Sequence, residues 1–138
     1  QIDRVRGTID RAVVFAAGFT LLIWPLLILG SDSIGSIFDL PVGGMDLIHA
    51  FAWIVVPLFF FNGLLFISNA SFNNLDRANW SSLTNWGRNT LGVLPFAYVG
   101  SQMAGAPGVL IGQAMGGVLF GLGAYWLTRY RVNQLQKL

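Results

Sequence analysis

Residues 89–128 read NTLGVLPFAYVGSQMAGAPGVLIGQAMGGVLFGLGAYWLT, a run of forty residues without a charged side chain. The hydrocarbon core of a bilayer, roughly 30 Å thick, is crossed by about 20 apolar residues in a helix. The run is therefore long enough to cross twice. It is interrupted at Gly105-Ala106-Pro107, where Gly is suited to end one helix and Pro to begin the next. We predict two transmembrane helices here, at about 84–104 and 107–128.

Two further segments have the length and composition of membrane helices. The first, AVVFAAGFTLLIWPLLILG at 12–30, lies between Arg11 and a polar turn expected at Ser31-Asp32-Ser33, and the second covers about 45–72. The whole chain is 54% hydrophobic and 10% charged, whereas about a quarter of the residues of soluble proteins are charged. The segments are too long for β-barrel strands, which take about ten residues of alternating polarity. The sequence thus predicts one all-α integral membrane domain over residues 1–138, with four transmembrane helices.

The eight Lys and Arg residues alternate between the two sides of the predicted membrane. Three precede the first helix, two lie in the loop 73–88 and three follow the fourth helix, while the loop 31–44 and the break at 105–107 have none. By the positive-inside rule both termini face the cytoplasm, and Arg77 and Arg88 are expected to anchor the cytoplasmic loop. We therefore expect a multi-pass protein of the inner (plasma) membrane. The cations are Arg4, Arg6, Arg11, Arg77, Arg88, Arg129, Arg131 and Lys137.

The composition argues against catalytic and metal sites. The chain has no Cys and no Glu, a single His, and aspartates on the flanks of the predicted helices. These residues supply no metal-ligand set, nucleophile triad or carboxylate pair within the membrane. We expect no enzymatic activity, no metal and no cofactor, and the few surplus arginines do not predict nucleic-acid binding. His49 is interpreted as an interfacial residue bonded to water or a backbone carbonyl, with proton handling as the alternative.

Polar residues inside the second predicted helix are the candidates for a transport pathway. Asn62, Asn69 and Asn73 have i, i+7, i+11 spacing and fall near one stripe, with Phe66 on the same side. A buried Asn requires partners, so the stripe should face protein or a wet cavity. One interpretation is the wall of a substrate or ion pathway, to which Phe61 also contributes. The other is a set of interhelical hydrogen bonds, each worth about 1 kcal/mol or less.

Two prolines and a glycine-rich face should affect how the helices bend and pack. Pro57 and Pro95 lie near the centre of their helices and each removes a backbone hydrogen bond. We predict kinks, either as bending points beside a transport cavity or as static features of the packing. The fourth helix has glycines at 108, 112 and 116, a small-xxx-small pattern that permits close helix approach. Gln113 lies beside this seam and should point inward, because lipid penalises its amide.

The run SNASFNNLDRANWSSLTNWGRNTLGVLPFAYVGSQMAGAPGVLIGQAMGGVLFG at residues 68–121 resembles the C-terminal end of the multidrug and toxic compound extrusion (MATE) family, and the RVRG before the first helix fits the preceding segment. The resemblance covers nearly the whole chain. It implies the last four helices of a six-helix bundle, the C-terminal lobe of such a transporter, with both chain ends in the cytoplasm. Because the chain is only part of such a transporter and starts at Gln1, we expect a fragment. Its partners are then the remaining helices, the bilayer and a small-molecule substrate.

The resemblance further implies a secondary active antiporter that exports drug-like, often cationic or amphipathic compounds in exchange for protons or sodium. Some family members carry an intramembrane Asp in the helix that corresponds to the second one here, at a position that matches about Asn62. Asparagine does not exchange a proton in the physiological pH range. Its oxygen can still bind sodium or a substrate, and the coupling acids are expected in the remaining helices.

Two other classes of protein stay open at this point. One is a self-dimerising small multidrug exporter of four helices, although such proteins rely on a membrane-embedded Glu and this chain has none. The other is a small four-helix membrane subunit or scaffold, which packs against a partner through the glycine face of its fourth helix.

Overall fold

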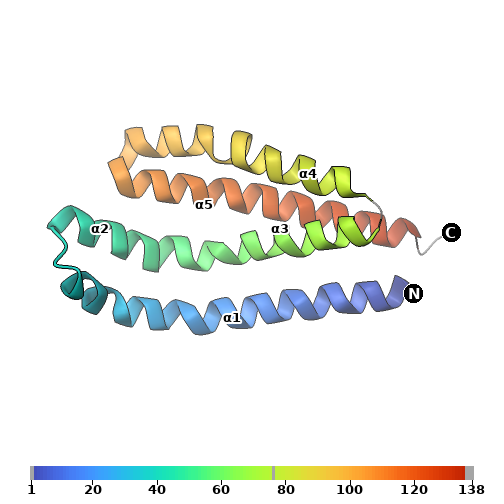
Figure 1. Cartoon of the computed structure of the whole chain (residues 1–138), viewed down its shortest axis with the longest axis horizontal. Coiled ribbons are helices and arrows are strands. Elements are labelled where there is room, and N and C mark those ends of the chain that lie inside the picture. The colour runs from blue at the N-terminus through green and yellow to red at the C-terminus, as the bar shows by residue number, and fades with distance from the viewer. Residues whose placement is uncertain (1, 76, 136–138) are drawn as a thin grey trace.

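The computed structural model describes residues 2–75 and 77–135, which are helical almost throughout (Figure 1). The prediction of an all-α membrane fold is confirmed. Lys137, counted above in the C-terminal cation cluster, lies outside the described residues. The elements in chain order are α1 (Ile2–Ile37), α2 (Val42–Ala50), the π-helix η1 (Phe51–Val55), α3 (Val56–Asn74), α4 (Ala78–Gly87), the π-helix η2 (Arg88–Gly92) and α5 (Leu94–Leu135).

The helices form three long apolar stretches, and the third stretch folds back on itself. The stretches long and apolar enough to cross a membrane are Asp3–Ile37, Val42–Asn74 and Ala78–Leu135. The third is broken inside α5 at Ala104 and Gly105, where Gly105 has a φ of 61° that favours glycine. This break lies at the predicted position. It divides α5 into a first arm, residues 94–103, and a second arm, residues 106–135, so that the chain crosses four times (Figure 1).

The two ends of the described chain lie at the same end of the bundle, as four crossings require (Figure 1). An ion pair joins them there, because Arg129 Nη1 donates a hydrogen bond of 2.6 Å to Asp10 Oδ1. We call this the terminal end. The opposite end, which contains the connection between α1 and α2 and the break in α5, is called the turn end.

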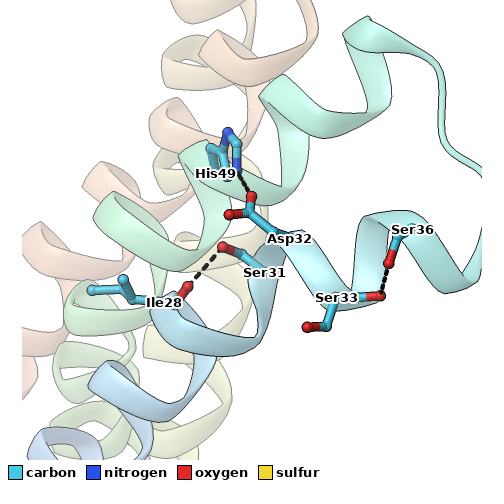
Figure 2. Close-up of polar contacts among 6 residues, drawn as sticks. All are labelled: Ile28, Ser31, Asp32, Ser33, Ser36 and His49. Carbon is cyan, nitrogen blue, oxygen red and sulfur yellow. Dashed lines mark hydrogen bonds and ion pairs between the residues drawn. The ribbon is translucent and has the colours of Figure 1, made fainter.

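The helices extend beyond their predicted bounds. α1 continues through the turn expected at Ser31-Asp32-Ser33 and ends at Ile37. Ser31 Oγ donates to the carbonyl of Ile28 at 2.7 Å, and Ser36 Oγ donates to the carbonyl of Ser33 at 2.9 Å (Figure 2). These hydroxyl groups bond within the helix and so do not interrupt it. For the later helices, α4 begins at Ala78 rather than at about residue 84, and α5 continues to Leu135.

The helix type changes just before each proline that was predicted to produce a kink. η1 directly precedes α3, which has Pro57 as its second residue. η2 ends shortly before α5, which has Pro95 as its second residue. Proline lacks an N–H group and its ring clashes with the carbonyl four residues earlier. The wider π turn relieves this clash, so each helix has a local irregularity where its proline predicts one.

The second arm of α5 packs backbone to backbone against η2 and the first arm. A Cβ atom placed on Gly108, Gly112 or Gly116 would overlap the backbone of the opposite segment. This is the close approach that the small-xxx-small pattern predicts. We call this contact the glycine seam, and its opposed pairs are Gly100 with Gly108, Phe96 with Gly112, and Gly92 with Gly116.

α3 lies at the centre of the bundle, between α1 and the second arm of α5 (Figure 1). Its innermost side chains are Leu64, Leu65, Ser68 and Phe72, each 3% exposed or less. α1 is peripheral by comparison, since none of the residues in its most apolar window is buried. The interface between α1 and α3 is therefore open, and it contains the first of the two candidate sites.

Candidate functional site

An open groove with a volume of about 400 Å³ lies between α1 and the helix formed by α2, η1 and α3. Its volume is in the range of small-molecule pockets, about 300 to 1,000 Å³. We call it the aromatic groove, because six phenylalanines line it together with two polar side chains. These are Phe15, Phe19, Phe51, Phe59, Phe60 and Phe66, with Thr20 and Asn62. Such walls suit an apolar or aromatic molecule that needs few hydrogen bonds.

Asn62 lies at the inner edge of the aromatic groove and is 8% exposed. Its amide packs against the second arm of α5, where a Cβ on Gly117 would lie 3.0 Å from Asn62 Oδ1. This oxygen is buried and accepts no hydrogen bond. A buried acceptor without a donor costs about 1 to 3 kcal/mol. Asn62 therefore brings an unsatisfied polar group to a largely apolar wall.

A second cavity, of about 110 Å³, lies between η1 and α3, η2 and the second arm of α5. Asn62, Arg88 and Gln113 are its polar lining residues, and we call it the Arg88 cavity. Arg88 Nη1 donates to Asn89 Oδ1 at 3.1 Å, but Arg88 Nε is buried without an acceptor. Neither of the two ion pairs found in residues 2–75 and 77–135 includes Arg88. Its positive charge thus has no counter-charge in the described part of the chain.

Arg88 does not lie in the loop expected at 73–88 but inside a helix. α4 begins at Ala78, so Arg88 lies ten residues, or about 15 Å, along a continuous helix. The glycines on either side of it, Gly87 and Gly92, both pack against the ring of Phe120. Phe120 is nine residues, or about 14 Å, from Arg129 at the terminal end. Arg88 therefore lies level with Phe120, well inside the helical stretch and away from the terminal end. The absence of Pro between 78 and 94 is the sequence signal that places Arg88 within the helix.

The other two asparagines of the predicted stripe have different environments. Asn69 is 6% exposed and bridges α3 to α4. Its Nδ2 donates to Asn85 Oδ1 at 3.0 Å, and its Oδ1 accepts from Thr84 Oγ1 at 2.8 Å. Asn73 is exposed near the terminal end of α3. The stripe thus contains one groove residue, one interhelical hydrogen-bonding residue and one surface residue.

The remaining predicted pathway residues are also divided between the two sites and the packing. Phe66 is 65% exposed and lines the aromatic groove. The ring of Phe61 packs edge to face on Phe60, with centroids 5.4 Å apart, and its carbonyl lies against Gly121. Gln113 is exposed in this chain, yet it lines the Arg88 cavity. The structure therefore brings Asn62 together with Phe66 on one side and with Gln113 on the other.

His49 lies at the turn end and connects α2 to α1. Its Nε2 is 2.8 Å from Asp32 Oδ1 (Figure 2). Its partner is thus a carboxylate, and not the water or backbone carbonyl that the sequence suggested, because α1 continues through Asp32 and brings this side chain within reach. The two side chains are 44% and 82% exposed, and exposed pairs of this kind contribute about 0 to 1 kcal/mol.

The described residues contain no group of three or more His, Cys, Asp or Glu side chains that could hold a metal ion. The chemistry of both sites therefore rests on aromatic surfaces, amide groups and the Arg88 guanidinium.

Four antiparallel crossings, with π segments before two prolines, define the fold as an all-α bundle of long apolar helices. The fold is similar to the crystal structure of the Vibrio cholerae MATE transporter VcmN in the bent form, with a TM-score of 0.85 and 19% sequence identity. The match covers 96% of this chain and 30% of that chain. No protein-family model and no curated protein sequence matches the chain. The structure thus establishes a multi-pass membrane fold, in agreement with the resemblance in the sequence.

Proposed function

We propose that this chain is part of the C-terminal lobe of a secondary active exporter of the MATE type. Such a protein moves drug-like compounds out of the cell in exchange for protons or sodium, and it is not an enzyme. The observation that carries the proposal is the structural match over 96% of the chain. The aromatic groove supports it, because a wall of phenylalanines with one buried amide suits amphipathic compounds of varied shape.

In this proposal the membrane is the inner membrane and the terminal end of the bundle faces the cytoplasm. Arg4, Arg6, Arg11, Arg129 and Arg131 are all near this end, in the first turns of α1 or the last turns of α5. The excess of arginine there is what the positive-inside rule requires of a cytoplasmic face. The orientation does not depend on Arg88, because the other arginines near the terminal end still outnumber those of the turn end.

The helix irregularities at η1 and η2 are the proposed bending points of the transport cycle. A π segment has less regular hydrogen bonds than an α-helix, and such segments frequently occur at functional sites. η1 contributes Phe51 and Val55 to the cavities, and η2 contributes Arg88. A bend at either segment therefore changes the shape of a cavity directly.

The coupling ion is proposed to bind mainly on helices outside this chain. The carboxylates of the described residues are all exposed: Asp3, Asp10, Asp32, Asp39 and Asp46. Asn62 contributes an oxygen that sodium or a substrate can bind, but it carries no exchangeable proton. The chain therefore forms the wall of the pathway and its bending points.

The test is an efflux assay with the complete protein that contains this chain, expressed in cells without other drug exporters. Ethidium is the probe, and the proton and sodium gradients are collapsed separately. We expect ethidium export that stops with one of the two gradients. A protein that exports neither ethidium nor any other compound of a cationic and neutral drug panel would contradict the proposed function.

The role of Asn62 is tested in the same assay with Asn62→Ala and Asn62→Asp. We expect Asn62→Ala to slow export severalfold with protein levels unchanged, and Asn62→Asp to change the dependence on the proton gradient. Asn73→Ala is the matched control, because Asn73 is on the same helix but exposed at its end. Export and coupling that are unchanged in both Asn62 variants would exclude Asn62 from the pathway.

A further inference from the structure

Arg88 is a partly buried charged side chain inside a long apolar helical stretch, and its set of partners is incomplete. Its Nη1 binds the neighbouring Asn89, while its Nε is buried and has no acceptor. Burying a charge without a counter-charge is costly, and intramembrane arginines almost always pair with an acid, a backbone carbonyl or a ligand. The environment of Arg88 therefore calls for an anion that the described residues do not supply.

The cavity that Arg88 lines extends away from the nearest membrane surface. A long side chain of α4 or η2 would normally tilt towards the start of its helix, here the terminal end, and reach the aqueous interface there. The Arg88 cavity is instead bounded by Gln113 and Ala114. These residues lie between Gly112 and Gly116, which pack on Phe96 and Gly92 respectively. Phe96 and Gly92 follow Arg88 along its helix, so Gln113 and Ala114 are closer to the turn end than Arg88 is. The Arg88 cavity therefore does not lead the guanidinium towards the aqueous interface at the terminal end.

The other walls of the cavity suit an aromatic carboxylate. Phe51, Val55, Phe59 and Leu110 provide apolar surface on which a ring can pack. Asn62 and Gln113 provide two amide groups beside the guanidinium. The guanidinium is the strongest of these donors to a carboxylate, and the amide N–H groups of Asn62 and Gln113 can donate to it as well. The volume of about 110 Å³ allows one small organic acid or the acidic end of a larger molecule.

We propose that Arg88, with Asn62 and Gln113, binds the carboxylate group of a small aromatic acid or zwitterion in the Arg88 cavity. Phe51, Phe59 and Asn62 line this cavity and the aromatic groove alike, so the two sites are neighbours. The assignment rests on the proposed export function and deepens it, because it adds carboxylate-bearing compounds to the substrates and names the residue that selects them.

The proposal is tested by binding to the purified complete protein in lipid nanodiscs. Benzoate and benzamide are the probes, because they have nearly the same shape and differ in charge. We expect the wild-type protein to bind benzoate at least about tenfold more tightly than benzamide, since a charge-assisted hydrogen bond is worth about that factor or more. Arg88→Gln should abolish this preference, and Arg88→Lys should retain part of it.

Arg77→Gln is the matched control, because Arg77 is exposed just before α4 and should leave the preference unchanged. Equal binding of the two probes by the wild-type protein, or a preference that survives Arg88→Gln, would overturn the proposal. A third outcome would also overturn it: the wild type shows no benzoate preference, and Arg88→Gln strongly lowers thermal stability. In that case the counter-charge of Arg88 is an acidic side chain of the protein itself. Benzoate binding without export of any compound would contradict the proposed function and leave the site intact.

Discussion

Two interfaces of this bundle use small residues in opposite ways. Along the glycine seam the backbones of α5 and η2 touch, and no room remains for a single Cβ. Between α1 and α3, Gly63 faces Ala16 with room for a Cβ at 3.4 Å, and the aromatic groove of about 400 Å³ opens beside them. Packing along the seam can be close because small residues allow backbone contact. The comparison indicates that the α5 hairpin is a rigid unit and that α1 is the helix with freedom to move.

The largest effect is expected from a methyl group inserted into the glycine seam. Gly116→Ala should lower the free energy of unfolding by about 1 to 3 kcal/mol or more, because the added Cβ overlaps the backbone of Gly92. The measurement is thermal unfolding of the complete protein in detergent. Gly123→Ala is the control on the same arm, because nothing lies within 4 Å of its Cβ position. Equal stability of the two variants would show that the seam is not tight.

A somewhat smaller effect is expected at the interface between α3 and α4, where polar groups replace close packing. Asn69→Ala removes the hydrogen bonds with Asn85 and Thr84, and should cost about 1 to 3 kcal/mol. In the variant Thr84 Oγ1 can donate its single proton to the carbonyl of Trp80, 2.8 Å away, which limits the loss. The exposed Asn73→Ala should change stability by less than about 0.5 kcal/mol. Both are measured by thermal unfolding, and a smaller loss for Asn69→Ala than for Asn73→Ala contradicts the assignment.

Gly63→Ala tests the open side of the comparison with the same chemical change as Gly116→Ala. Its Cβ meets Ala16 Cβ at an ordinary contact distance of 3.4 Å. Because alanine favours the helix over glycine by up to about 1 kcal/mol, the unfolding free energy should stay the same or rise slightly. The same unfolding assay decides the matter. A loss as large as that of Gly116→Ala means that α1 packs on α3 as tightly as the two arms of α5 pack on each other.

The smallest effect is expected at the turn end, where the contact between α1 and α2 is exposed (Figure 2). Asp32→Asn removes the charge that His49 Nε2 approaches to 2.8 Å. Exposed pairs contribute about 0 to 1 kcal/mol, so the midpoint of thermal unfolding should move little. Because salt screens exposed charges, the difference from the wild type should become smaller still at high salt. A loss above about 2 kcal/mol is evidence that this pair, and not the packing of α3, holds α1 in place.

Much of the fold could be predicted because the membrane imposes strong local rules. A helix must satisfy its own backbone hydrogen bonds in lipid, so apolar length alone indicates the four crossings. Gly105 before Pro107 marks the break, and the glycine spacing marks the seam. The ends of the helices were less predictable. Ser31 and Ser36 bond to backbone carbonyls of their own helix, and the sequence pattern does not distinguish such serines from those of a turn.

The candidate sites were predictable in part. Asn62 and Phe66 were identified from their place on one helix face, and both line the aromatic groove. Asn69 has the same spacing but is used between α3 and α4, because Asn85 and Thr84 lie opposite it. Helix periodicity shows which residues share a face, but it does not show which neighbour that face meets.

The sequence by itself determined the all-α membrane fold class, the number of crossings and the close packing of the α5 hairpin, because these depend on hydropathy and on residue size. Only the tertiary structure decided that Arg88 shares a cavity with Asn62 and Gln113. The count of cations assigned Arg88 to a loop. The positive-inside rule uses the charges near the end of a helix, but it does not identify the residue at which the helix begins. The proximity of these three residues arises from helix packing between segments that are far apart in the chain, and no local pattern records it.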